Sequence, residues 1–152
     1  MSDYYPVYLN LKGRTCIIIG GGRVAEGKIS RLREAGAGIT VISPQVTPVI
    51  RAAAQEGYLE WHDREYRDGD LKQAFLAIAA TNVRSVNRQI FQEAERLNVL
   101  LNVVDDAPLC TFIAPSIVER GPVTLAISTG GASPALARKF REELNGTSPM
   151  SP

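Results

Sequence analysis

A run of three glycines followed by Arg-Val-Ala is the first feature of this chain that could support chemistry. Residues 20–25 fit the GxGxxA dinucleotide fingerprint, with Gly20, Gly22 and Ala25 at its three defining places. In that pattern the first glycine allows a tight turn, and the second lets the backbone approach a pyrophosphate. The small third residue lets a helix pack closely on a strand. The alternative is a glycine turn that only links a strand to a helix.

A second candidate is the pair of adjacent carboxylates Asp105 and Asp106, which follows the apolar segment 99–104. Adjacent carboxylates at the ligand-binding edge of a sheet can share a raised pKa and transfer protons. The alternative is a solvated turn before Pro108, which is the more common role for such a pair.

The elements that would position these residues alternate between short apolar runs and longer segments with helical spacing. Strands separated by helices imply right-handed crossovers and a parallel sheet. The expected fold is therefore α/β, a Rossmann-type doubly wound parallel sheet, with ligands at the carboxyl ends of its strands. The predicted strands cover residues 15–19, 39–43, 58–62, 75–80 and 99–104, and the predicted helices cover residues 24–35, 46–55 and 83–97.

After residue 112 the pattern changes to two further strands, 112–118 and 123–128, and a helix over 134–144. We expect residues 1–112 to form the dinucleotide-binding domain and residues 113–144 a small α+β region. Residues 145–152 are expected to form a disordered tail.

A second strand-glycine-helix junction covers residues 128–134, where Ser133 is a suitable N-cap and Pro134 suits the first helical turn. This junction either holds a second anionic group or simply begins a helix.

Two further strand ends should reach the same edge of the sheet. The fingerprint expects an acidic residue about 20 positions on to hold the ribose hydroxyls, and Ser43 stands there instead. Pro44 and Gln45 add no basic side chain for a 2′-phosphate, so NAD is favoured and NADP stays open. Thr81 and Asn82 end the fourth strand, where we expect a cofactor contact and a cap from Asn82 on the following helix.

Composition excludes several classes of function. The chain has 152 residues, the size of one domain, and its formal net charge of +1 argues against a dedicated nucleic-acid binder. Cys16 and Cys110 are too few and too far apart for a disulfide framework or a zinc site, and no metal site is expected. His62 is the only histidine, which argues against a Ser-His-Asp triad. Without a signal peptide or a membrane-spanning run, a cytoplasmic protein is expected.

The ordered set of motifs resembles the precorrin-2 dehydrogenases, both the standalone bacterial enzymes and the amino-terminal module of sirohaem synthase. The resemblance extends from about residue 4 to residue 144. It is carried by residues 5–11 (Tyr-Pro-Val-Tyr-Leu-Asn-Leu), 20–28 (Gly-Gly-Gly-Arg-Val-Ala-Glu-Gly-Lys), 79–82 (Ala-Ala-Thr-Asn), 102–106 (Asn-Val-Val-Asp-Asp), 112–116 (Phe-Ile-Ala-Pro-Ser) and 128–134 (Ser-Thr-Gly-Gly-Ala-Ser-Pro).

The resemblance implies NAD-dependent oxidation of precorrin-2 to sirohydrochlorin, a step of sirohaem biosynthesis. It implies Asp105 as the catalytic base. It further implies that Arg23 and Val24 lie against the cofactor and that Pro44 and Gln45 lie by its adenosine end. Members of the family lack an acidic residue after the second strand, as this chain does.

The resemblance also implies a homodimer formed through residues 113–144. Longer members continue into a helical domain that helps to close the substrate site, so we expect a more open site here or a second chain that completes it. Thr129 stands where some members carry a regulatory phosphoserine, which makes that regulation doubtful. The tetrapyrrole substrate carries carboxylates, so basic residues should surround it, and the candidates are Arg120, Arg138, Lys139 and Arg141.

Two alternatives to a simple dehydrogenase stay open at this point. Some members of the family also insert ferrous iron, and a bifunctional dehydrogenase and ferrochelatase would use Asp105 for both reactions. The other alternative is a non-catalytic, NAD-binding accessory or redox-sensing subunit.

Overall fold

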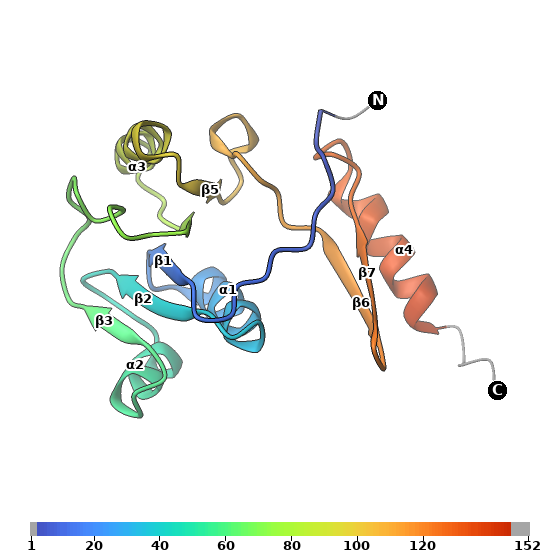
Figure 1. Ribbon diagram of the computed structural model, residues 1–152, viewed down its shortest axis with the longest axis horizontal. Helices are drawn as coiled ribbons and strands as arrows, with labels where there is room; N and C mark the ends of the chain where they lie inside the picture. Colours follow the sequence, from blue (N-terminus) through green and yellow to red (C-terminus); the bar gives the residue numbers. More distant parts are fainter. Residues whose placement is uncertain (1–2, 147–152) are drawn as a thin grey trace. The chain divides into compact units, whose positions relative to one another are not determined.

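The computed structural model describes residues 3–146, which divide into two compact units (Figure 1). The larger unit comprises Val7–Phe112, and the smaller unit comprises residues 3–6 and 113–146. Residues 3–6, which were expected to belong to the first domain, thus group with the carboxyl-terminal segment.

The larger unit is built on a five-stranded parallel sheet with the strand order β3-β2-β1-β4-β5. The chain starts in the middle of the sheet, runs outward to β3 and returns to the other side of β1. The order therefore reverses between β1 and β4, which confirms the expected Rossmann-type sheet. The strands are β1 (Thr15–Ile19), β2 (Gly38–Ile42), β3 (Glu60–His62), β4 (Leu76–Ala79) and β5 (Leu100–Val103).

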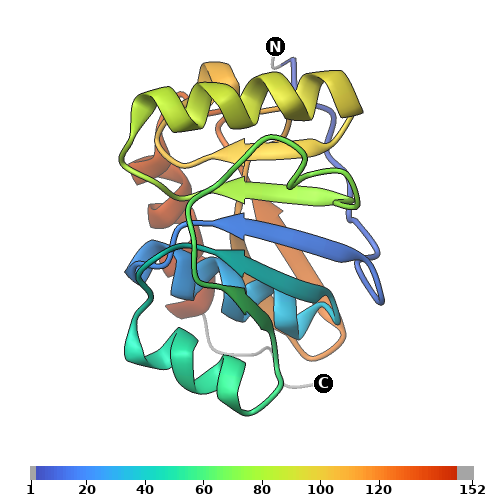
Figure 2. The ribbon, with the colours of Figure 1, turned by 90° about the vertical axis from the view of Figure 1, so that its left-hand side faces the viewer.

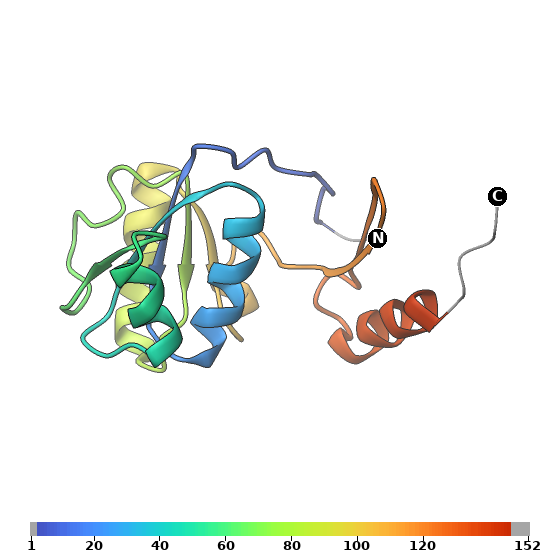
Figure 3. The same cartoon turned by 90° about the horizontal axis from the view of Figure 1, so that it is seen from below.

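Helices cover both faces of this sheet (Figures 2 and 3). Helices α1 (Arg23–Glu34) and α2 (Pro48–Gln55) pack on one face, and α3 (Arg84–Leu97) packs on the other. Helix α2 begins two residues later than predicted, because Thr47 is its N-cap and accepts a hydrogen bond from the Ile50 N–H at 3.3 Å. A proline at the first position of a helix fits this start.

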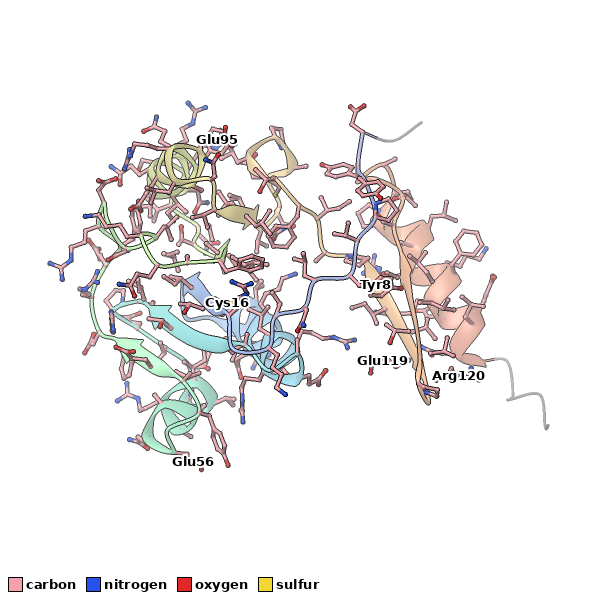
Figure 4. The ribbon with its side chains drawn as sticks, viewed as in Figure 1. Tyr8, Cys16, Glu56, Glu95, Glu119 and Arg120 are labelled. Carbon is pink, nitrogen blue, oxygen red and sulfur yellow. The ribbon has the colours of Figure 1, made fainter. Side chains whose placement is uncertain are left out.

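Strand β1 explains why its sequence is a continuous apolar run. Successive side chains of a strand point to opposite faces. Cys16 and Ile18 accordingly enter the layer under α1 and α2, whereas Ile17 and Ile19 enter the layer under α3. All four are at most 5% exposed, and Figure 4 labels Cys16 within the sheet.

The connection from β3 to β4 contains turns instead of a crossover helix, and a buried carboxylate holds it in place. Glu93 of α3 is 1% exposed. Its carboxylate accepts hydrogen bonds from the Tyr66 hydroxyl at 2.6 Å, the Gly69 N–H at 2.5 Å and the Leu71 N–H at 3.4 Å. Three donors compensate for the loss of hydration that burial imposes on this side chain.

The smaller unit consists of an antiparallel hairpin and one helix. The hairpin pairs β6 (Ser116–Arg120) with β7 (Val123–Ile127) through a two-residue turn that starts at Gly121, with φ +55°. Helix α4 (Pro134–Gly146) contacts β6 and extends two residues past the predicted end, into the segment assigned to a disordered tail. Residues 147–152 of that segment lie outside the described residues.

Strand β6 begins four residues later than predicted. Phe112 is still bound to the larger unit, since its N–H donates to the Leu101 carbonyl at 3.4 Å and its carbonyl accepts from Asn102 at 3.1 Å. Pro115 then has no N–H for a strand ladder. Residues 112–115 therefore form a connection and not a strand.

The junction at residues 128–134 begins α4 through its own side chains. The Ser133 hydroxyl accepts a hydrogen bond from the Leu136 N–H at 3.2 Å, which confirms Ser133 as the N-cap. Two further amides are taken up within the loop, the Gly130 N–H by Ser128 at 3.0 Å and the Ser133 N–H by Thr129 at 2.8 Å. These hydrogen bonds are those expected where a loop leads into a helix, so the junction acts as the start of α4.

Candidate active site

Four loops of the larger unit begin at the same level of the sheet. The register places Ile42, Ile19, Ala79 and Val103 side by side across β2, β1, β4 and β5. Because the strands are parallel, the loops after these residues all lie at the carboxyl edge, where ligands of such sheets bind. They are the residue 43–47 loop, the glycine loop, the Thr81 turn and the Asp105 turn. Together with the first turn of α1, which follows the glycine loop, they carry the predicted catalytic and cofactor-binding residues.

The first two glycines of the glycine loop are required by packing. An ideal Cβ on Gly20, which has φ +120°, would lie 2.3 Å from the Ala80 carbonyl oxygen. A Cβ on Gly21 would lie 2.2 Å from the Gln45 carbonyl oxygen. The fingerprint gives no requirement for Gly21, because Gln45 approaches from a loop more than twenty residues further along the chain.

Gly22 differs from these two glycines, and it provides the test of whether a dinucleotide fits. An ideal Cβ on Gly22 meets no heavy atom of the described residues within 4 Å. No described side chain caps α1 at Gly22, so the first backbone N–H groups of the helix are available to an anion. Open space beside a free helix N-terminus is the arrangement that binds a pyrophosphate.

The three residues after Gly22 divide between the surface and the core. Ala25 is fully buried, which confirms the close packing expected of it. Arg23 and Val24 are exposed in the first turn of α1. Val24, which the resemblance places against a cofactor, is 51% exposed.

The loop after β2 is held by a chain of hydrogen bonds. The indole N–H of Trp61, on β3, donates to the Ser43 carbonyl at 2.8 Å. The hydroxyl of Ser43, a buried residue, donates to the Gln45 carbonyl at 2.6 Å. The Thr47 N–H then donates to the Gly21 carbonyl at 2.9 Å, which joins this loop to the glycine loop. Pro44 and Gln45 are left exposed at the tip.

A shallow hollow opens beside these two joined loops. It lies between the N-terminal ends of α1 and α2 and is lined by Arg23, Glu26, Thr47, Pro48 and Val49. The hollow thus borders both the glycine loop and the loop that carries Pro44 and Gln45.

The expected cap of α3 by Asn82 is wrong. The N-cap of α3 is Val83, and Asn82 is exposed. The Thr81 hydroxyl accepts from the Val83 N–H at 3.2 Å and bonds the Asn87 side-chain oxygen at 2.8 Å, while the Asn87 amide donates to the Thr81 carbonyl at 3.2 Å. Thr81 and Asn87 together close the turn, so the Asn82 side chain is not needed for it.

Asp105 lies in a tight turn directly after β5. It is exposed and has φ +61°, in the left-handed region that Asp tolerates better than most residues. The Asp106 N–H closes the turn on the Val103 carbonyl at 3.2 Å, and a short 3₁₀ helix (Ala107–Leu109) follows. The turn presents the Asp105 side chain at the carboxyl edge of the sheet.

The residues that hold this turn were not found from the sequence. The Val103 N–H donates to the Cys110 sulfur at 3.1 Å, and the Leu101 N–H donates to the Thr111 hydroxyl oxygen at 2.7 Å. Burial raises the pKa of the Cys110 thiol, while a hydrogen bond from Val103 and the charge of Lys28 oppose that rise. The only sign of this role in the sequence is that two small polar residues, Cys110 and Thr111, follow the turn. Such pairs are common in loops.

Two other residues considered from the sequence have structural partners of their own. The ring of His62 bonds the Glu60 carboxylate at 2.6 Å. In the smaller unit the Arg120 guanidinium donates to the Leu144 carbonyl at 2.5 Å and the Asn145 carbonyl at 3.1 Å, at the C-terminal end of α4 (Figure 4). Arg120 therefore stabilises that helix end.

Within residues 3–146, no three His, Cys, Asp or Glu side chains gather in a group that could hold a metal ion. Over the same residues, no helix has the length and apolar character needed to cross a membrane.

Two families of known proteins and a solved structure match this chain. A family described as putative NAD(P)-binding matches residues 7–116, and one described as sirohaem biosynthesis protein central matches residues 120–147. The solved structure of SirC, a precorrin-2 dehydrogenase, is 32% identical with a TM-score of 0.80, covering 93% of this chain and 70% of that one. The chain belongs to the precorrin-2 dehydrogenase family.

Other relatives in the family are considerably longer proteins. The siroheme synthase of Photorhabdus laumondii is 44% identical over 149 residues, and siroheme synthase 1 of Cronobacter sakazakii is 44% identical over the same length. Both alignments cover 98% of this chain and 32% of the relative. The chain thus spans about a third of the length of these curated relatives, and a nicotinamide dinucleotide is the cofactor class of the matched part.

Proposed function

We propose that this chain catalyses the NAD-dependent oxidation of precorrin-2 to sirohydrochlorin in sirohaem biosynthesis. The observation that carries the proposal is the common level of the glycine loop and the Asp105 turn, which follow the two strands on either side of β4 and start at the same position in the register of the sheet. The likeness to SirC over most of both chains supports the same activity.

The chemistry divides between the cofactor and one side chain. Removal of two hydrogens from the tetrapyrrole takes away one hydride and one proton. A bound nicotinamide supplies the acceptor for the hydride. The Asp105 carboxylate takes the proton as general base, and its exposed position leaves it accessible to a substrate.

The residues of the glycine loop would hold the cofactor's phosphates. The first N–H groups of α1, beside Gly22, bind the pyrophosphate charge, and Arg23 and Val24 lie against the cofactor. Pro44 and Gln45 border its adenosine end, and Thr81 and Asn82 flank it from the end of β4. This assignment accounts for the otherwise unfilled space over Gly22.

NAD is the proposed form of the cofactor. The Ser43 hydroxyl is directed to the Gln45 carbonyl, and the exposed residues at the tip of that loop are Pro44 and Gln45. The loop therefore offers no basic side chain to a 2′-phosphate, which an NADP-binding site commonly supplies at this place.

A homodimer formed through the smaller unit is part of the proposal. A hairpin and one helix give little core, and Val118 and Ala137 are the buried apolar residues that the described part of this unit provides. Its apolar side chains are largely exposed, and a second copy of the chain would cover them. They are Val123 and Leu125 on β7, and Leu136, Phe140 and Leu144 on α4.

An anaerobic assay with enzymatically generated precorrin-2 tests the function directly. Purified protein is supplied with NAD or with NADP and no metal, and absorbance is followed for sirohydrochlorin and for the reduced cofactor. We expect both products in equal amounts with NAD, and slower turnover with NADP. Cofactor binding without any turnover would contradict the proposal and favour a non-catalytic, NAD-binding accessory subunit.

A further inference from the structure

The outer edge of β5 is covered by a segment that also contacts the Asp105 turn. β5 is the last strand of the sheet, so one of its edges has no neighbouring strand. Such an edge carries backbone groups in need of partners. Thr111 supplies some of them, because its hydroxyl accepts from the Leu101 N–H at 2.7 Å and its own N–H donates to the Leu101 carbonyl at 2.8 Å.

Cys110 continues this coverage by two residues and reaches the turn itself. Leu101 and Val103 are two positions apart on β5, so their backbone groups face the same edge. The Val103 N–H donates to the Cys110 sulfur at 3.1 Å, and the same sulfur lies 3.2 Å from the Val103 carbonyl and 3.4 Å from the Asp106 carbonyl. The thiol therefore contacts backbone on both sides of Asp105.

The turn needs such support because of its backbone conformation. Asp105 has φ +61°, a conformation that costs free energy for any residue with a side chain. Only one backbone hydrogen bond, from the Asp106 N–H to the Val103 carbonyl at 3.2 Å, closes the turn directly among the described residues. The cysteine is protonated at neutral pH, since burial raises its pKa, and so its thiol can donate to one of the two carbonyls.

We propose that Cys110 is a positioning residue, whose thiol holds the turn after β5 so that the Asp105 carboxylate stays aligned for proton transfer. The proposal rests on the proposed function for the role of Asp105. Cys110 itself takes no proton from the substrate and forms no covalent bond; it acts through the backbone of Val103 and Asp106.

Three variants test this role in the full-length protein. Cys110→Ala removes the sulfur, and Cys110→Ser keeps a group that both donates and accepts. Cys16→Ala is the matched control, because it makes the same chemical change at a fully buried cysteine of β1. The readouts are kcat and KM for precorrin-2, the dissociation constant for NAD, and amide hydrogen exchange of residues 104–109 without cofactor.

We expect Cys110→Ala to lower kcat about tenfold, since small misplacement of a catalytic group has effects of this order or larger. The dissociation constant for NAD should change less than about twofold, because the glycine loop is untouched. Amide exchange should accelerate at Asp106 and Leu109, and Cys110→Ser should recover most of the loss in kcat. Cys16→Ala should lower thermal stability and leave kcat near the wild-type value.

The inference is overturned if Cys110→Ala and Cys16→Ala have the same kcat and the same exchange in residues 104–109. It is also overturned if the dissociation constant for NAD changes as much as kcat, which would indicate general disruption of the domain. If the wild-type protein has no turnover, the proposed function fails, and exchange alone decides whether the thiol holds the turn.

Discussion

Asp105 takes a backbone conformation that asparagine also tolerates, so its carboxylate can be removed without disturbing the turn. We expect Asp105→Asn to lower the turnover of precorrin-2 by about a hundredfold or more, the usual contribution of a general base. The dissociation constant for NAD should stay unchanged within about twofold, because the phosphate-binding loop is intact. Steady-state kinetics and calorimetric titration with NAD check the two expectations.

Asp106→Asn provides the comparison for this experiment. The two carboxylates are adjacent, but Asp105 has positive φ and is exposed, whereas Asp106 is half-buried. A loss of turnover confined to Asp106→Asn would move the role of general base to the second carboxylate.

Gly21 and Gly22 are neighbours, but packing leaves no room for a side chain at Gly21 and leaves open space at Gly22. Alanine substitution should therefore have different effects at the two positions. A methyl group on Gly21 would collide with the Gln45 carbonyl, so Gly21→Ala should lower the free energy of unfolding by about 2 kcal/mol or more. A methyl group on Gly22 enters open space, so Gly22→Ala should fold with nearly unchanged stability and lose NAD affinity. Thermal unfolding and titration with NAD distinguish the two effects. Equal NAD affinity in Gly22→Ala and wild type would contradict the assigned pyrophosphate position.

At the scale of the elements, local sequence patterns predicted the strands of the sheet well. They did not predict side-chain contacts between one element and the loop next to it. β1 could be predicted to its last residue, because a continuous apolar run followed by glycines is a signal contained within the segment. The start of α3 was predicted to within one residue, but its cap was not, since Asn87 inside the helix, and not Asn82, closes the Thr81 turn. The glycine loop was predicted for the same reason as β1. Cys110 was missed, because its partner Val103 becomes a neighbour only when the chain folds back along β5.

The loop after β2 depends on β3, and this dependence can be measured. Trp61→Phe keeps an aromatic ring but removes the N–H that holds the Ser43 carbonyl. Leaving a partly buried carbonyl without its donor costs about 1–3 kcal/mol. We expect Trp61→Phe to raise the dissociation constant for NAD about tenfold, as measured by calorimetry. Steady-state kinetics should give an unchanged kcat at saturating NAD. An unchanged dissociation constant would mean that the loop holds its shape without β3. Because Trp61 is the only tryptophan, its fluorescence in the wild-type protein should also respond to NAD.

For the whole molecule, the exposed apolar side chains of α4 decide whether the chain acts alone. Leu136, Phe140 and Leu144 are spaced four residues apart, so they lie on one face of the helix. Each is between 39% and 47% exposed, an arrangement that is unfavourable in water unless another surface covers it. We expect light scattering of the wild-type protein at micromolar concentration to give twice the chain mass of 16.5 kDa.

A single charge on this face should dissociate the dimer. In a symmetric pair each substitution acts twice. Because Phe140 is already half-buried in the single chain, covering the rest of it contributes about 1 kcal/mol per copy, so Phe140→Asp should raise the dissociation constant of the dimer by at least about thirtyfold. Lys139→Asp places the same side chain at the adjacent exposed position of α4 and should leave the dimer intact. Circular dichroism checks that both variants fold. A wild-type monomer, or equal dissociation of the two variants, would mean that the apolar face of α4 is not where the copies meet.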